Sequence, residues 1–235
     1  MQYRYLLITS FLFASKSHSH ESFIDFKVDQ SKHRIELRLL DENGKPLGSF
    51  KRLKNELDGK GQDLIFSMNA GIYMQNQMPL GLYIENSKTY RKLNTKKNLY
   101  GNFYLNPNGV FLISNGKAHI LESDLFNRFS RDHPIEYATQ SGPLLLINGK
   151  YNQSLSKYDK NKVIRNAVCI NSRNEVTFSI SKKSVSFSEM GRHLSEDLMC
   201  TSGLYLDGSI SGAYKDQITT SNFNLYGPLF LVRSL

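Results

Sequence analysis

The sequence predicts an α+β fold, with a mostly antiparallel or mixed β-sheet core and a few helices. Three observations predict this class: many short segments of strand length, Asn-Gly turn signals between them, and few segments with apolar residues at helical spacing. The 235 residues are 40% hydrophobic and 22% charged, which is ordinary globular composition. Global disorder, collagen and coiled coil are therefore excluded.

Strands are predicted from two kinds of pattern. Alternation of apolar and polar residues predicts strands over 23–28 and 34–39. Apolar runs predict the remaining strands over 64–68, 82–85, 102–105, 110–114, 117–121, 143–147, 163–170, 175–180, 203–206 and 227–232. Because Asn-Gly suits a type I′ turn, hairpin tips are predicted at Asn43-Gly44, Asn108-Gly109, Asn115-Gly116 and Asn148-Gly149.

Helices are predicted at three places. Apolar residues recur at helical spacing over 187–199, and Ser186 with Glu189 forms a capping box at the start of that segment. Two further helices are expected over 49–57 and 122–129. The helices do not alternate regularly with strands, and no Pro/Gly/Ser-rich linker divides the chain. A single domain is therefore expected.

Residues 1–19 have the pattern of a secretory signal peptide. Arg4 precedes an apolar stretch over 5–14, and small or polar residues follow it. The stretch is shorter than the roughly 20 apolar residues that span a bilayer. A buried N-terminal strand or helix is the alternative. We expect a domain over 20–235 that is exported, periplasmic or secreted, and has no transmembrane segment.

Charge and cysteine content limit the partners. The net charge of +9 suits an anionic partner or substrate. The basic clusters at 51–54, 96–97 and 182–183 are too short for a nucleic-acid-binding stripe, so no nucleic acid is expected. Cys169 and Cys200 are too few for a Cys-only zinc site. In an oxidising compartment they either form a disulfide or stay as two buried thiols, and the sequence leaves both open.

Common catalytic and cofactor motifs are missing from the sequence. There is no H-E-x-x-H, no G-x-x-x-x-G-K-[ST] and no G-x-G-x-x-G. Residues 208–212 resemble a nucleophile elbow, but the central position is Ile210 and not serine. The acids in the glycine-rich segments are too few for a hard-cation site. We expect neither a metal nor a cofactor.

Four polar or glycine-rich segments follow or interrupt apolar strands. They cover 67–73, 138–144, 164–168 and 204–212. Such segments allow a backbone to approach a ligand closely from a rigid support. A tight turn explains any one of them, but four in one exported chain favour a binding site.

The order of these motifs resembles that of the phosphodiester glycosidase family. The resemblance covers about residues 67–214 and rests on Asn69-Ala-Gly-Ile-Tyr73, Pro79-Leu-Gly81, Gln140-Ser-Gly-Pro-Leu144, the strand with Arg165, and Leu206-Asp-Gly-Ser209. It implies catalytic roles for Asn69, Arg165 and Asp207. It implies substrate-binding roles for Gly71, Gln140, Ser141, Gly142, Gly208, Ser209 and Ser211. The sequence departs from the family pattern at Ala70 and Ile72, and in the largely lost glycine-rich tail after Gly208.

The implied activity is hydrolysis of a sugar-1-phosphodiester bond, in a sugar phosphate or an envelope glycan. An arginine can hold a phosphate with a bidentate fork, so Arg165 is expected to bind the phosphate. Asp207 is expected to act at the anomeric carbon, as nucleophile or as general acid/base. Asn69, Gly208 and Ser209 are expected to orient the substrate. A buried structural ion pair between Arg165 and Asp207 is the alternative.

Some questions stay open at this point. Glycosidases commonly use two carboxylates, and Glu85 is either the second one or a surface charge at a strand end. The stereochemical course is not fixed. Two other classes of function remain: a non-catalytic envelope glycan- or polyanion-binding protein that keeps the family cleft, and a basic exported protein that binds a polyanion such as nucleic acid or teichoic acid through its lysines.

Overall fold

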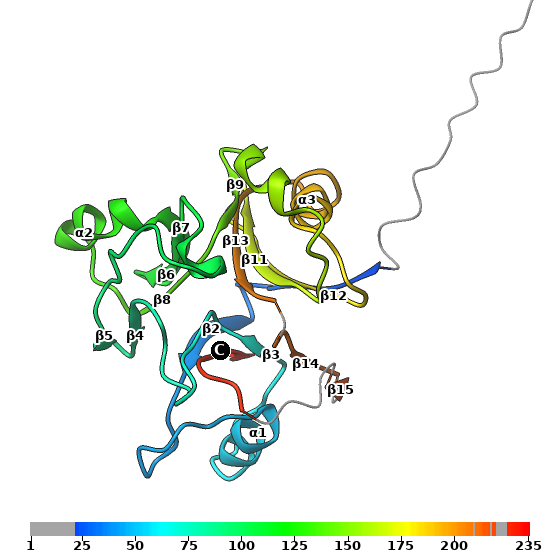
Figure 1. Ribbon diagram of the computed structural model, residues 1–235. Helices are drawn as coiled ribbons and strands as arrows, with labels where there is room; N and C mark the ends of the chain where they lie inside the picture. Colours follow the sequence, from blue (N-terminus) through cyan, green and yellow to red (C-terminus); the bar gives the residue numbers. More distant parts are fainter. Residues whose placement is uncertain (1–21, 209, 217, 220–224) are drawn as a thin grey trace, which may run out of the picture.

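The computed structural model describes residues 22–208, 210–216, 218–219 and 225–235 (Figure 1). Its strands are β1 Phe23–Lys27, β2 His33–Arg38, β3 Phe66–Asn69, β4 Tyr83–Glu85, β5 Lys88–Arg91, β6 Gly109–Ser114, β7 Lys117–Glu122, β8 Tyr137–Ser141, β9 Leu144–Ile147, β10 Lys150–Tyr151, β11 Asn166–Asn171, β12 Val176–Ser181, β13 Cys200–Asp207, β14 Ala213–Lys215, β15 Ile218–Thr219 and β16 Leu229–Ser234. Its helices are α1 Phe50–Asp58, α2 Ser123–Asp132, α3 Phe187–Arg192, the 3-10 helices η2 Asn102–Tyr104 and η3 Gln153–Tyr158, and the π-helix η4 His193–Asp197.

The strands form three antiparallel sheets. The first has the order β1-β12-β11-β13-β9-β10, the second β15-β14-β3-β16-β2 and the third β5-β4-β8-β6-β7. The strand pairings within the three sheets are antiparallel. This confirms the predicted α+β class with a mostly antiparallel core.

One central core joins the three sheets. Phe111 of the third sheet, Phe178 of the first and Phe230 of the second meet there. Their ring centroids lie 5.1 Å apart for Phe111 and Phe230, and 4.8 Å apart for Phe178 and Phe230. Because each sheet supplies one side of the same core, the three sheets form a single domain.

Each sheet also carries a helix on its outer face (Figure 1). Helix α1 packs on the second sheet, α2 on the third and α3 on the first, each through its own apolar cluster. Strands covered on both faces need apolar residues at every position. Strand β6 shows this, because all six of its residues are buried. Apolar runs, and not alternation, therefore marked most of the strands in the sequence.

The three predicted helices are confirmed, with shifts of a few residues at their ends. Ser49 caps α1 by accepting a hydrogen bond from the Arg52 backbone N–H at 3.2 Å. The capping box before α3 is formed as expected: Glu189 N–H donates to Ser186 Oγ at 3.1 Å, and Ser186 N–H donates to Glu189 Oε2 at 2.7 Å. The predicted segment 187–199 is realised as α3 followed by η4.

Two sequence-based expectations are wrong. Residues 102–105 are not a strand, because Asn102–Tyr104 form the 3-10 helix η2 and Leu105 caps its end. Asn108-Gly109 is no hairpin tip, because Gly109 is the first residue of β6. A Cβ on Gly109 would lie 2.6 Å from Leu144 Cδ2, so this glycine serves close packing between strands. In contrast, Asn115-Gly116 and Asn148-Gly149 do form hairpin tips, and all four residues have positive φ.

A disulfide joins Cys169 of β11 to Cys200 of β13, which decides between the two alternatives for the cysteines. Within the described ranges, no helix combines the length and apolar character of a membrane span. The predicted signal peptide over 1–19 lies outside the described residues.

Candidate active site

Strand ends from all three sheets meet at one place. Asn69 is the last residue of β3, Ser141 the last of β8, and Asp207 the last of β13, while Asn166 begins β11 beside Asp207. These strands belong to the second, third and first sheets. Residues from distant parts of the sequence are therefore held on rigid supports around Asp207.

Two asparagine side chains link Asn69 to Asp207. Asn166 Nδ2 donates to Asn69 Oδ1 at 2.7 Å, and Asp207 N–H donates to Asn166 Oδ1 at 2.9 Å. Asn69 Oδ1 also accepts from Gly212 N–H at 3.0 Å. Asn69 Nδ2 is buried and has no partner among the described residues. A buried donor without a partner costs about 1–3 kcal/mol, so this amide is free to donate to a ligand.

The segment after β3 is fastened to the third sheet. Ser141 Oγ donates to the Leu206 carbonyl at 2.9 Å and accepts from Ile72 N–H at 3.4 Å. Gly71 has φ +126°, and a Cβ there would come within 3.1 Å of Thr139 Oγ1. Glycine is therefore required at position 71, both for its backbone angle and for the close approach to β8.

The turn after Asp207 is held by its own hydrogen bonds. Gly208 N–H donates to Asp207 Oδ1 at 2.6 Å. Ser211 Oγ lies 3.0 Å from the Asp207 carbonyl, 2.8 Å from the Gly208 carbonyl and 3.2 Å from Asn166 Oδ1. Ser211 thus fixes the turn. Ser209 lies outside the described residues.

Asp207 has the electrostatic character of a proton-transfer group. Burial raises the pKa of its carboxyl to about 7, and the Gly208 N–H opposes this rise. Its side chain keeps some exposed surface. In the part of the chain that the structure describes, no cation pairs with it. A carboxyl with a pKa near neutrality can both give and take a proton at neutral pH.

Arg165 does not face Asp207. Its guanidinium is fully buried and donates to the Val185 carbonyl from Nε at 2.9 Å, to the Asn161 carbonyl from Nη2 at 2.6 Å, and to Tyr205 Oη from Nη1 at 3.1 Å. No ion pair between Arg165 and Asp207 is present among the described residues. The structure therefore links Asn69 and Asp207 through Asn166. The Arg165 guanidinium is held by other groups and bonds to neither of these two residues.

Comparison with known proteins identifies the family. Residues 62–223 match the sequence profile of a family described as phosphodiester glycosidase. The chain belongs to the phosphodiester glycosidase family. It is 33% identical to the uncharacterized protein YigE of Escherichia coli strain K12 over 189 aligned residues. The aligned region covers 80% of this chain and 72% of YigE.

Solved structures share the fold. The catalytic domain of zebrafish N-acetylglucosamine-1-phosphodiester α-N-acetylglucosaminidase, auto-inhibited by its pro-peptide, matches with a TM-score of 0.57 at 12% identity, over 90% of this chain and 88% of that chain. A hypothetical protein from Synechocystis matches with a TM-score of 0.56 at 13% identity, over 91% and 59%. A candidate exported protein of Burkholderia pseudomallei K96243 matches with a TM-score of 0.55 at 10% identity, over 89% and 73%.

Two of the predicted substrate-binding residues of this phosphodiester glycosidase family member shape the third sheet. Gln140 Oε1 accepts from Leu82 N–H at 3.0 Å and from Asn94 N–H at 2.9 Å, so its side chain fastens neighbouring segments to β8. A Cβ on Gly142 would lie 2.5 Å from the Asn108 Cβ, so this glycine permits close packing. Contact of either residue with a substrate stays a prediction.

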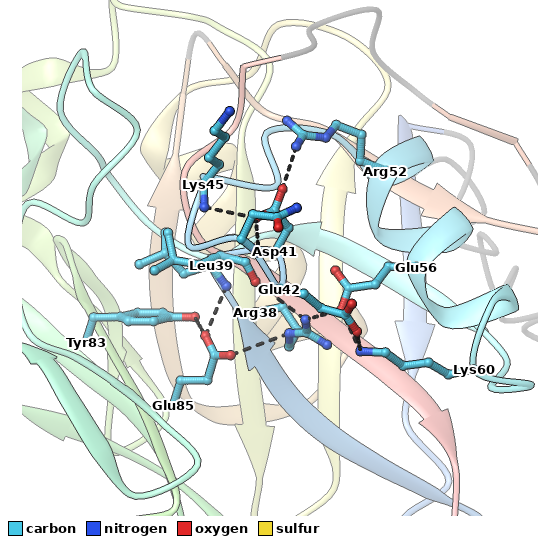
Figure 2. A network of polar contacts seen from close by, with 12 residues as sticks. Arg38, Leu39, Asp41, Glu42, Lys45, Arg52, Glu56, Lys60, Tyr83 and Glu85 are labelled. Atoms are coloured by element: carbon cyan, nitrogen blue, oxygen red, sulfur yellow. Dashed lines mark hydrogen bonds and ion pairs between the residues drawn. The ribbon is translucent and has the colours of Figure 1, made fainter.

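Glu85 is neither a second carboxylate for Asp207 nor a surface charge. It is buried in a network at the opposite end of the third sheet, beside the start of β8 (Figure 2). Glu85 Oε2 accepts from Leu39 N–H at 3.0 Å and from Tyr83 Oη at 2.9 Å, and Oε1 lies 3.4 Å from Arg38 Nε. Both sequence-based interpretations of Glu85 are therefore wrong.

Sequence reasoning missed three residues near Asp207. Asn166 connects Asn69 with Asp207, and Tyr205 contacts Arg165. Burial and the nearby Asp207 charge raise the pKa of Tyr73. The sequence signals for these three residues are weak. Asn166 directly follows Arg165, and Tyr73 and Tyr205 lie in the segments 67–73 and 204–212, which also contain Asn69 and Asp207. Among the described residues, no three His, Cys, Asp or Glu side chains gather as metal ligands.

Proposed function

We propose that this member of the phosphodiester glycosidase family hydrolyses a sugar-1-phosphodiester bond, with Asp207 acting at the anomeric carbon. The observation that carries the proposal is the position of Asp207. Its carboxyl, with a pKa of about 7, ends a strand where the three sheets meet. The buried Asn69 amide, which lacks a partner for Nδ2, is linked to the same turn through Asn166.

Asp207 acts as a general base in the proposed reaction. Its carboxylate takes a proton from a water molecule, whose oxygen bonds to the anomeric carbon. The bond between that carbon and the phosphate oxygen breaks, and its electron pair leaves with the phosphate monoester. A phosphate leaves more readily than an alkoxide and needs less protonation, so one carboxyl suffices where other glycosidases use two.

The surrounding residues orient the substrate. Asn69 Nδ2 has no partner among the described residues, and Asn166 links the Asn69 amide to the Asp207 backbone. We assign Gly71 and Gly208 to the substrate-binding segments on the sequence motifs. Ser141 and Ser211 hold the segments that contain these two glycines. We keep Ser209 as a substrate contact on the sequence motif alone.

We further propose that the domain over 20–235 is exported and acts on an envelope glycan or glycolipid, in the periplasm or after secretion. The pattern of residues 1–19 supports this location. The Cys169–Cys200 disulfide supports it too, because such bonds are typical of oxidising compartments. The net charge of +9 favours an anionic substrate.

Substitution of Asp207 by Asn tests the proposed activity. Turnover of a panel of sugar-1-phosphodiesters, followed by release of free sugar and phosphate monoester, should fall at least about a thousandfold. Asp58→Asn is the matched control, because Asp58 is an exposed acid on α1 that forms an ion pair with Lys54. That control should keep the wild-type rate. Full activity of Asp207→Asn would contradict the role of Asp207. If the wild-type protein binds these diesters but releases no product, it is a binding protein and not a hydrolase.

A further inference from the structure

Arg165 is a buried cation whose hydrogen bonds all go to neutral groups. Its three donor nitrogens meet two backbone carbonyls and one phenol oxygen, and its guanidinium carbon lies 3.8 Å from the centroid of the Phe187 ring. Asp159 acts on it only through space, and the Asp159 carboxylate already accepts from the Ser188 N–H and hydroxyl. Burying a charge is costly unless a counter-charge is close. The guanidinium charge therefore has no directly bonded counter-charge among the described residues.

Tyr205 is the only side chain to which Arg165 donates among the described residues. Its hydroxyl oxygen accepts from Arg165 Nη1 at 3.1 Å and from Asn102 Nδ2 at 3.4 Å. These two donors occupy the oxygen, and the hydroxyl proton has no acceptor among the described residues. Burial raises the pKa of Tyr205 above its usual range, so the proton stays on the oxygen at neutral pH. A phenol polarised by a guanidinium is a stronger donor than a free one.

The Tyr205 hydroxyl lies against the turn that follows Asp207. A Cβ on Gly208 would overlap Tyr205 Oη. Glycine at position 208 thus lets the turn rest on this hydroxyl. Tyr205 and Arg165 have no exposed surface in this structure.

We propose that Tyr205 and Arg165 are positioning residues for the hydrolysis: Arg165 fixes and polarises the Tyr205 hydroxyl, which supports the Asp207–Gly208 turn from behind. This inference rests on the proposed function and revises the direct phosphate contact expected for Arg165. A fixed positive charge behind the turn stabilises negative charge that builds on the departing phosphate, and it needs no rearrangement during the reaction. Because the diester is already an anion and negative charge increases on the phosphate as it departs, the charge acts more on kcat than on the affinity for the substrate.

Tyr205→Phe tests the hydroxyl while keeping the ring. On the best sugar-1-phosphodiester of the panel, kcat should fall about 10- to 30-fold, and KM should stay within about twofold. Tyr83→Phe is the matched control, because Tyr83 is equally buried and its hydroxyl donates to Glu85 far from Asp207. Tyr83→Phe should keep wild-type kcat. Equal kcat values for Tyr205→Phe and the wild type would overturn the inference, as would equal losses in both variants.

Arg165→Met and Arg165→Lys test the charge. Arg165→Met should lower kcat about 100-fold. The kcat of Arg165→Lys should be at least about tenfold higher than that of Arg165→Met, because lysine restores a positive charge. Equal rates for Met and Lys would overturn the role of the charge. A rise in KM alone for Arg165→Met would instead indicate direct phosphate binding. If Asp207→Asn keeps full activity, the proposed function fails; if only Tyr205→Phe does, this inference fails alone.

Discussion

Arg38 and Arg165 are both held inside the molecule, but their partners differ. Arg38 ends β2, and its guanidinium lies 2.5 Å from Glu56 Oε1 and 3.4 Å from Glu85 Oε1 (Figure 2). Arg165 precedes β11 and, among the described residues, donates to carbonyl and phenol oxygens only. The half-buried Arg38 is thus matched by two carboxylates, and the buried Arg165 is matched by neutral groups.

The pKa values follow this difference. Burial lowers the pKa of Arg38, but its hydrogen bond with Glu56 and the nearby acids outweigh that effect and raise it. Burial lowers the pKa of Arg165, and the groups that oppose the shift do not restore it. A charge that is matched inside the fold serves stability, whereas an unmatched one can act on a ligand.

The largest expected effect on stability is at Arg38. Arg38→Met leaves the buried Glu85 without its cation, while the half-buried Glu56 keeps Lys60, so the free energy of unfolding in urea should fall by about 3–5 kcal/mol. Arg165→Met strands only neutral oxygens and should lose about 1–2 kcal/mol. The folded fraction of Arg38→Met should keep its activity. Equal losses of stability in the two variants would break the comparison.

The same contrast extends to acids, with a smaller effect. Asp207 has its pKa raised from 3.8 to about 7 by burial, so its protonated form is favoured in the folded state. Stability from this group is complete below pH 3.8 and is lost as the pH rises through 7. Asp207→Asn should therefore gain stability relative to the wild type as the pH rises from 4 to 8, by no more than about 4 kcal/mol. Urea titrations at pH 4 and pH 8 measure this, and an equal difference at both values would contradict it.

The smallest effect is expected at His193, a cation matched by two acids. His193 Nε2 lies 3.0 Å from Asp25 Oδ1, and Nδ1 lies 2.9 Å from Asp197 Oδ2. Burial lowers the pKa of His193, but the hydrogen bond with Asp25 and the other contacts raise it above 6.5. This contribution is complete below pH 6.5 and is lost as the pH rises through the folded value.

Thermal unfolding at pH 6 and pH 9 measures the contribution of His193. The wild type should lose about 1 kcal/mol more than His193→Gln over this range. A similar pH dependence in both proteins would show that the imidazole is neutral in the fold. His193 would then not belong with Arg38 as a matched cation.

Much of the fold could be predicted because local signals agreed with tertiary packing. Ser186 and Glu189 form the predicted capping box, and the helix expected from residue 49 is found as α1. Strand β8 was missed because its sequence, Tyr-Ala-Thr-Gln-Ser, is polar. Its buried polar groups are satisfied by partners from other elements, as with Thr139 Oγ1 and the Ala70 carbonyl at 2.5 Å. Such long-range pairing leaves no local signal.

The site was predicted in part. The motifs identified Asn69 and Asp207, and the structure joins them through Asn166. The direction of the Arg165 side chain could not be predicted, because it depends on Val185 and Tyr205, which are distant in the sequence, as well as on the nearby Asn161 carbonyl. A motif predicts the position of a residue along the chain, but contacts with other segments determine the direction in which its side chain points.

Three sheets contribute one strand end each around Asp207, through β3, β8 and β13. The segments that leave these ends are joined to one another, because the Ile72 N–H donates to Ser141 Oγ and the Gly212 N–H donates to Asn69 Oδ1. A change of length or sequence in one segment therefore disturbs the supports of the others. Relatives should acquire new substrate preferences through coordinated changes in more than one segment, while the Asp207 carboxyl stays where it is.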